Sequence, residues 1–283
     1  MADNLIDDVR LAHMLADSAD SITMDRFRSD DLSVQVKEDD TAVTDADTAV
    51  EEALKRTLAT ARPRDGFHGE ESGESGWGRR RWVIDPIDGT ANFVRGAPVW
   101  ATLIALVIGE LPVLSVVSAP ALSRRWWAHQ GGGAFAGRGL LSGKKIEVSS
   151  VDWVSDAFLS YSSLGGWVDS GRGRQFGDLL RSAQRTRGFG DFWSYMMVAE
   201  GSVDIACEPD LALHDMAALV PIVTEAGGRF TSLDGDPGPV GPGALATNAR
   251  LHEQVLNMLA MDVGDDKEDS LVIARRAVPV TED

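Results

Sequence analysis

The chain has 283 residues, 43% of them hydrophobic, which is enough for one large core or two moderate ones. Its 44 acidic residues against 27 basic ones give a net charge of -17, which opposes binding to nucleic acid or to an anionic membrane. The apolar run from Trp100 to about Ile108 is far too short to cross a bilayer, and the first residues lack the character of a secretory signal. We therefore expect a cytoplasmic protein. The single Cys207 excludes an internal disulfide and fits a reducing compartment.

Two amphipathic helices are predicted near the N-terminus, because apolar residues recur at helical spacing over residues 5–19 and again over 50–61. The stretch 37–47 between them is acidic, and we expect it to be mobile. Strand-like runs follow at 82–84, 102–108, 113–118 and 124–128. Gly109-Glu110 is a hairpin turn within this group, and the glycines 131–133 lack the Lys-Ser/Thr of a P-loop and indicate a plain turn.

From about residue 149 strands and helices alternate, which is typical of an α/β unit. The predicted strands are 157–162, 203–208 and 229–233, and the predicted helices are 172–184, 192–200 and 215–226. We therefore divide the chain into an N-terminal α+β half, 1–148, and a C-terminal α/β half, 149–262. Residues 263–283 are predicted to form a loosely attached tail.

The segment 82–90, Trp-Val-Ile-Asp-Pro-Ile-Asp-Gly-Thr, ends an apolar strand in two carboxylates separated by a Pro-restricted turn. Asp85 and Asp88 can face one point, and the carbonyl of Ile87 is free to turn inward as a third oxygen ligand for a hard cation. Gly89 and Thr90 then offer backbone N–H groups for a phosphate where a helix could begin at Thr90. Asp-Pro and Asp-Gly are also ordinary turn dipeptides, so the segment alone leaves both interpretations open.

Two further acidic segments favour the cation site. Glu70 lies in Gly69-Glu70-Glu71-Ser72, and Asp215 follows His214 far downstream. Carboxylates gathered without a counter-ion repel one another, so a fold that brings these groups together requires divalent cations. Because every candidate ligand is a hard oxygen, Mg²⁺ is favoured over Zn²⁺, and His214 is interpreted as structural.

The chain resembles the inositol-monophosphatase-like, metal-dependent phosphatases over roughly residues 5–260. The resemblance rests on the motifs at 69–72 and 82–93 and on the segment from Asp215 to Gly228. Within the family the chain is most similar to the bacterial histidinol-phosphate phosphatases, on the segments 92–96, 124–127 and 190–195. The resemblance implies the layered α-β-α-β-α sandwich of the inositol monophosphatase and fructose-1,6-bisphosphatase type, and a homodimer.

The same resemblance implies a site for two or three Mg²⁺ ions. Glu70, Asp85 and the Ile87 carbonyl would hold one ion, while Asp85, Asp88 and Asp215 would hold a second. Thr90 and Asp47, together with Glu70, would orient and deprotonate the attacking water. From the sequence alone, Asp47 is an equally good candidate for a helix cap.

The implied substrate is a small phosphorylated metabolite. It would be held by Asp88, Gly89, Thr90 and Asp215 around the phosphate, and by Arg187, Asp191 and Glu208 at the mouth of the site. Histidinol phosphate carries an amine and an imidazole, which acidic residues would favour over a neutral polyol. We therefore expect an Mg²⁺-dependent hydrolase that releases L-histidinol and phosphate in histidine biosynthesis. An inositol-1-phosphate or broad sugar-phosphate phosphatase, and a non-catalytic metal-binding regulatory protein, are the alternatives.

Overall fold

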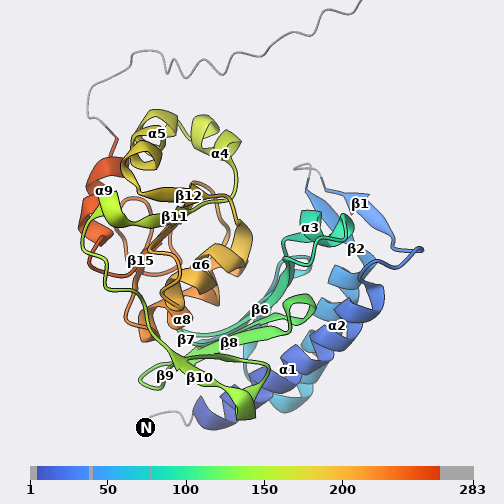
Figure 1. Cartoon of the computed structure of the whole chain (residues 1–283). Coiled ribbons are helices and arrows are strands. Elements are labelled where there is room, and N and C mark those ends of the chain that lie inside the picture. Colours follow the sequence, from blue (N-terminus) through green and yellow to red (C-terminus); the bar gives the residue numbers. More distant parts are fainter. Residues whose placement is uncertain (1–4, 38–40, 77, 262–283) are drawn as a thin grey trace, which may run out of the picture.

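The computed structural model describes residues 5–37, 41–76 and 78–261. Its strands form an eight-stranded sheet, a five-stranded sheet and a two-stranded hairpin. Helices and sheets are stacked in five layers, α-β-α-β-α, as Figure 1 shows. This is the layered arrangement that the resemblance predicts. The predicted tail, 263–283, lies outside the described residues.

The large sheet is mostly antiparallel and has the strand order β10-β9-β8-β7-β6-β5-β3-β4, with β3 and β5 parallel. Its strands are β3 Gly66–Gly69, β4 Gly73–Ser75, β5 Arg80–Asp88, β6 Ala101–Ile108, β7 Leu111–Ala119, β8 Arg124–His129, β9 Gly133–Gly137 and β10 Lys144–Ile146. The predicted hairpin at Gly109-Glu110 joins β6 to β7, and Gly109 has a φ of 70° there.

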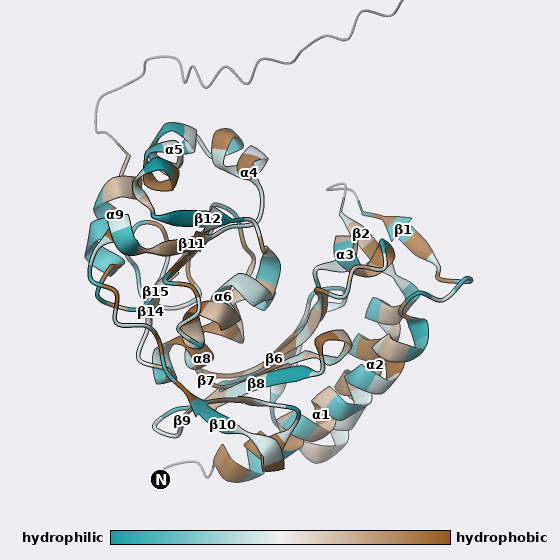
Figure 2. Ribbon diagram, in the orientation of Figure 1, coloured by the Kyte–Doolittle hydropathy of each residue, from teal (hydrophilic) through white to brown (hydrophobic). Residues whose placement is uncertain are grey.

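One face of the large sheet is covered by the two predicted N-terminal helices, α1 (Leu5–Arg26) and α2 (Asp45–Ala61). Hydrophobic and hydrophilic residues alternate along both helices (Figure 2). Leu15 and Leu54 are fully buried and pack with Trp82 in the core between these helices and the sheet. The apolar periodicity of the sequence therefore predicts correctly which face of each helix packs against the sheet.

The other face of the large sheet is covered by helices from the C-terminal part of the chain, chiefly α7 (Leu213–Ala217) and α8 (Leu219–Glu225), and α6 (Asp191–Ala199) packs on α8. Tyr195, Met196 and Ile222 lie in one continuous core with residues of the large sheet. The two predicted halves of the chain therefore share their largest core, and neither half covers its apolar surface alone.

The small sheet has the order β12-β11-β13-β15-β14, with β11 parallel to both β12 and β13. Its strands are β11 Phe158–Ser160, β12 Arg185–Arg187, β13 Ile205–Glu208, β14 Arg229–Thr231 and β15 Ala244–Thr247. Its outer face packs against α4 (Leu164–Asp169), α5 (Gly173–Ser182) and α9 (His252–Leu259) around a third core. Figure 1 shows these helices as the outermost layer.

The structure corrects three predictions. Within the stretch 37–47, Ala42–Thr44 is strand β2, paired with β1 (Val34–Val36), and α2 begins at Asp45; residues 38–40 lie outside the described part. The predicted helix 215–226 is two helices, α7 (Leu213–Ala217) and α8, because Pro221 lacks the N–H that would bond to the carbonyl of Ala217. The strand predicted to end at Ile84 continues to Asp88.

None of the helices in the described ranges combines the length and apolar character that a membrane span requires.

Candidate active site

Asp85 and Asp88 lie inside β5, at an irregularity in its pairing with β6. Asp85 pairs with Leu103 and Asp88 with Ala101, so β5 has one more residue than β6 in this interval. Pro86, which has no N–H to donate, lies in this bulge, and its carbonyl accepts a 2.8 Å hydrogen bond from the Thr102 hydroxyl. The bulge turns both carboxylates toward the same side of the strand.

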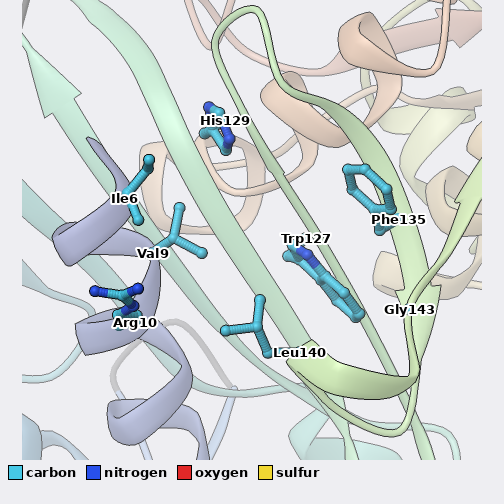
Figure 3. Close-up of a pocket in the computed structure, with 8 residues that line it drawn as sticks. All are labelled: Ile6, Val9, Arg10, Trp127, His129, Phe135, Leu140 and Gly143. Carbon is cyan, nitrogen blue, oxygen red and sulfur yellow. The ribbon is translucent and has the colours of Figure 1, made fainter. Parts of the chain in front are cut away.

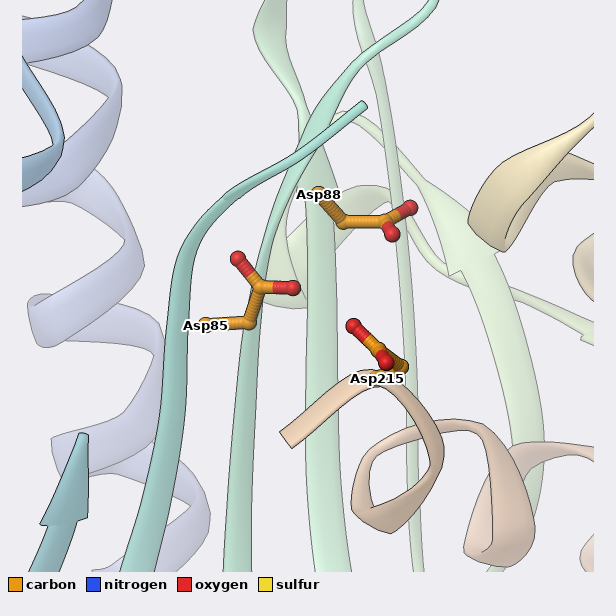
Figure 4. A group of neighbouring side chains, drawn as sticks. All are labelled: Asp85, Asp88 and Asp215. Atoms are coloured by element: carbon orange, nitrogen blue, oxygen red, sulfur yellow. The ribbon is translucent and has the colours of Figure 1, made fainter. Parts of the chain in front are cut away.

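Asp215 completes a group of three converging carboxylates (Figure 4). One oxygen from each of Asp85, Asp88 and Asp215 lies within 4.8 Å of the others. Asp215 is in the first turn of α7, where its Oδ2 accepts a 2.6 Å bond from the backbone N–H of Ala212. Residues more than one hundred positions apart thus meet at one point, as the sequence predicts.

The electrostatics of this group fit a divalent cation. Burial, Glu70 and Asp88 raise the pKa of Asp85 well above its ordinary range, and burial and Asp191 do the same for Asp88. Oδ1 of Asp85 is buried and has no hydrogen-bond partner among the described residues. A carboxylate oxygen left in this state is costly unless a cation binds it. The donors are all oxygens, the ligands that Mg²⁺ and Ca²⁺ prefer.

Glu70 lies on the turn between β3 and β4, with its backbone N–H bonded to the carbonyl of Ile84 at 3.2 Å. Its side chain forms an ion pair with Lys37, whose Nζ is 2.7 Å from Oε1 of Glu70 and 2.7 Å from Oε1 of Glu71. Glu70 is close enough to raise the pKa of Asp85, but the tight group of three carboxylates in the described chain does not include it.

Asp47 has the helix-cap role considered from the sequence, and its catalytic role stays a prediction. Its Oδ2 accepts bonds from the backbone N–H of Thr44 at 2.8 Å and from the Thr44 hydroxyl at 2.6 Å, which makes it part of the capping box of α2. Its Oδ1 is buried and has no partner among the described residues. Burial raises the pKa of Asp47 to about 6, although the bonds from Thr44 act in the opposite direction.

Thr90 begins the short helix α3 (Thr90–Val94), as predicted, with Gly89 as its N-cap. The Thr90 hydroxyl donates a 2.8 Å bond to the carbonyl of Ile87, so these two groups, predicted to act separately, contact each other. Gly89 has a φ of 84°, and a Cβ there would lie 3.0 Å from the carbonyl oxygen of Val99 and 3.2 Å from Oδ2 of Asp191. Only glycine fits this position without strain.

Asp191 lies at the start of α6, and hydrogen bonds join this helix to the segment 88–92. The backbone N–H of Phe192 donates to Oδ2 of Asp88 at 2.7 Å, and the amide of Asn92 donates to Oδ2 of Asp191 at 3.0 Å. Burial, followed by repulsion from Asp215, raises the pKa of Asp191 to about 6. Asp191 therefore borders the group of three carboxylates, and its contact with a substrate stays a prediction.

Glu208 ends β13 and is buried. Burial, together with Asp191 and Asp215, raises its pKa to about 8, although the neighbouring side chains of Tyr195 and Ser162 act in the opposite direction. Tyr195 was not among the predicted site residues. Its position four residues after Asp191 puts both on one face of α6, and this spacing could have identified it.

Arg187 and His214 were also considered from the sequence, and neither belongs to the group of three carboxylates. Arg187 ends the edge strand β12, and its exposed side chain donates to the carbonyl of Thr186 at 2.7 Å. Among the described residues, Arg187 forms no hydrogen bond or ion pair with the site acids. Nε2 of His214 lies 3.6 Å from Oδ1 of Asp215, and its ring stacks on His68 with 6.4 Å between centroids. The imidazole of His214 thus lies next to the carboxylate of Asp215.

A separate apolar pocket of about 340 Å³ lies between α1 and the strands β8 and β9 (Figure 3). It is lined by Ile6, Val9, Arg10, Trp127, His129, Phe135, Leu140 and Gly143. None of the site acids lines it, and its wall offers no set of converging charged groups. The candidate active site is therefore identified by its carboxylates and not by the size of a cavity.

The model of the inositol monophosphatase family matches residues 7–263. The chain belongs to the inositol monophosphatase family. Members of this family are metal-dependent and act on phosphorylated substrates, which agrees with the group of carboxylates described above. The family predicted from the motifs is therefore confirmed.

Similar proteins support both the family and the fold. The chain is 59% identical to the histidinol-phosphatase of Streptomyces coelicolor, over 90% of this chain and 97% of the relative. It is 52% identical to the histidinol-phosphatase of Mycobacterium tuberculosis, over 89% and 98%. The solved inositol monophosphatase of Zymomonas mobilis superposes with a TM-score of 0.79 at 30% identity, over 91% of this chain and 99% of that structure. The predicted fold class is confirmed.

The raised pKa values predict how stability depends on pH in the absence of metal. The pKa of Glu208 is raised from 4.5 to about 8, and the values for Asp191 and Asp47 from 3.8 to about 6. At a pH between the ordinary and the raised pKa of such a group, the folded chain binds more protons than the unfolded chain. These groups therefore reduce the stability of the fold as the pH rises. In EDTA, the variant Glu208→Gln should gain stability relative to the unchanged protein between pH 5 and pH 8.

The measurement is urea unfolding of both proteins at several pH values. The difference in their unfolding free energies should grow in favour of the variant by at least about 1 kcal/mol, because one pKa unit corresponds to roughly 1.4 kcal/mol. A difference that is constant with pH would show that Glu208 titrates normally in the folded chain.

Proposed function

We propose that this phosphomonoesterase hydrolyses L-histidinol phosphate to L-histidinol and phosphate, with Mg²⁺ as its cofactor. The observation that carries the proposal is the identity of 59% and 52% to two histidinol-phosphatases over almost the whole chain. The likeness to a solved inositol monophosphatase at 30% identity is weaker, so an inositol or sugar phosphatase is the second candidate. A non-catalytic regulatory role has no observation in its favour.

The proposed metal ligands are the residues predicted from the sequence. Asp85, Asp88 and Asp215 would hold one cation. Asp85, Glu70 and the Ile87 carbonyl would hold a second cation, so Asp85 would be shared. We propose two or three ions per site. The unpartnered Oδ1 of Asp85 and the convergence of three carboxylates support this assignment. Bound Mg²⁺ would neutralise charge on the phosphoryl group and acidify the attacking water.

The residues of the chain would orient the reactants. The backbone N–H groups of Gly89 and Thr90 would hold the phosphoryl oxygens, since they lie where the segment after Asp88 turns into α3. The Thr90 hydroxyl, now bonded to the Ile87 carbonyl, would help to orient and deprotonate the attacking water, assisted by Asp47, whose Oδ1 has no partner among the described residues. Glu70 would release its ion pair with Lys37 in order to take part.

The selectivity is assigned to the acids that border the metal site. Histidinol phosphate carries an amine and an imidazole, both able to be positively charged near neutral pH. A cation placed against Asp191 and Glu208 would offset the burial and the repulsion that raise the pKa of both groups. The rings of Phe189 and Trp193, with centroids 5.5 Å apart, flank Asp191 in the sequence and are the aromatic groups proposed for a flat cationic ring. Arg187 remains a predicted substrate contact.

The homodimer, the cytoplasmic location and the division into halves at residue 148 also remain proposals. The full burial of the single Cys207 agrees with a structural thiol that needs no oxidising compartment.

Asp85→Asn tests the metal assignment. The substitution keeps the size of the side chain and removes the charge shared by both proposed cations, so kcat with histidinol phosphate should fall by about a hundredfold or more at saturating Mg²⁺. The matched control is Asp169→Asn, the same change at an exposed position at the end of α4. If Asp85→Asn retained more than about a tenth of the original kcat, the shared-ligand assignment would have to be abandoned.

A comparison of two substrates tests the specificity. We expect kcat/KM for L-histidinol phosphate to exceed that for myo-inositol 1-phosphate by at least about a hundredfold, the equivalent of one or two well-placed polar contacts. Phosphate release with both substrates, with and without EDTA, is the measurement. Comparable values would favour the inositol or sugar phosphatase, and no release from either substrate would favour the non-catalytic alternative.

Asp191→Asn and Glu208→Gln test the proposed contacts to the cationic end of the substrate. Each should lower kcat/KM for histidinol phosphate by about tenfold to a hundredfold, as expected for the loss of a charged hydrogen bond. Hydrolysis of p-nitrophenyl phosphate, which has no cationic group, should change little. A parallel loss with both substrates would mean that these acids support the fold or the metal site and not recognition.

A further inference from the structure

Glu51 is a buried carboxylate of α2 that the proposed catalytic set does not use. Its side chain is 3% exposed. Oε2 accepts a 2.8 Å bond from the backbone N–H of Glu71, and Oε1 accepts a 2.8 Å bond from the backbone N–H of Ser72. Both oxygens are therefore engaged with two successive residues of the turn that carries Glu70.

These bonds fix the backbone of Glu70 from its C-terminal side. On the other side, the N–H of Glu70 bonds to the carbonyl of Ile84 in β5, one residue before Asp85. The β3–β4 turn is thus bonded to β5 through the N–H of Glu70, and to Glu51 through the N–H groups of the next two residues. A charged acceptor for two N–H groups is stronger than a neutral one, so the Glu51 carboxylate strongly restricts the orientation of this turn.

Helix α2 connects this turn to another proposed catalytic residue. Asp47, Glu51 and Lys55 follow each other at intervals of four, which places them on one face of the helix. Lys55 continues the contact beyond Glu51, because its Nζ lies 3.1 Å from the hydroxyl of Ser72. The rigid helix therefore sets the position of the turn relative to Asp47.

Gly69 shows how closely Glu51 approaches the turn. A Cβ at this position would lie 2.3 to 2.5 Å from the carboxyl atoms of Glu51. Gly69 is not among the glycines with positive φ, so its backbone conformation is open to any residue. The absence of a side chain at Gly69 is thus explained by the space that Glu51 occupies.

We propose that Glu51 is a positioning residue that fixes Glu70 for cation binding without touching the cation itself. The inference rests on the proposed function, since it requires Glu70 as a ligand. Glutamine at position 51 would keep the size but offer only one acceptor oxygen, and its NH₂ group would face a backbone N–H. The turn would then shift, and Glu70 would leave the position in which it lies close to Asp85.

The experiment measures Mg²⁺ binding to the full chain by isothermal titration calorimetry, with circular dichroism as a check of folding. Glu51→Gln should raise the Kd for Mg²⁺ by about tenfold or more, as is typical when a residue that orients a metal ligand is lost. The control is Glu52→Gln, the same change at the next position, where the side chain is 66% exposed. Its Kd should stay within about twofold of the original.

A second variant leaves the charge of Glu51 in place. Gly69→Ala should push the carboxylate aside and weaken Mg²⁺ binding to a similar degree, whereas in the Glu51→Ala background the added methyl group has room and should have little further effect. A folded Glu51→Gln protein with unchanged Mg²⁺ affinity, or losses that add in the double variant, would overturn the proposal. If Glu51→Gln does not fold, the proposal is tested by the effect of Gly69→Ala alone compared with its effect in the Glu51→Ala background. Failure of the unchanged protein to bind Mg²⁺ would instead reject the proposed function.

Discussion

The gathering of buried and half-buried carboxylates is the constraint on which the candidate site depends, because burial and mutual repulsion both disfavour their charged forms. Asp85, Asp88 and Asp215 meet within 4.8 Å, and Asp191 and Glu208 stand at their border. Without compensation such a group would spread apart or take up protons. The fold compensates in part, because backbone N–H groups at the starts of α6 and α7 donate to two of these carboxylates. The remaining negative charge is what a divalent cation would neutralise.

The acids can be held together because each one comes from an element anchored in a core. Strand β5 lies inside the large sheet, β13 inside the small one, and α6 packs between them. Closely packed cores of this kind resist the small displacements that would relieve the repulsion. The bulge at Pro86 adds the local turn that aims two carboxylates from one strand. Stability in the cores therefore maintains an electrostatically unfavourable site.

The sequence predicts those parts of the structure that depend on local patterns. The apolar periodicity identifies α1 and α2, and the segment 82–90 identifies the carboxylates of β5. The strand β15 was missed because a stretch rich in Gly and Pro, 235–243, precedes it and hides its pairing with β13. The ion pair of Lys37 and the contacts of Glu51 join positions 20 to 34 residues apart, so no local pattern announces them.

If the proposed function holds, the two ends of the site match the two ends of the substrate in charge: the metal end matches the phosphate, and the acidic end matches the amine and the imidazole. A phosphate approaching Asp85 would be repelled by a chain of net charge -17, so its binding requires a cation at that end of the site. At the other end an amine or an imidazolium would stabilise the charged forms of Asp191 and Glu208, whose pKa values are raised in its absence. A neutral polyol phosphate satisfies only the first condition. The arrangement of acids that makes the cation necessary therefore also favours a substrate with separated positive and negative groups.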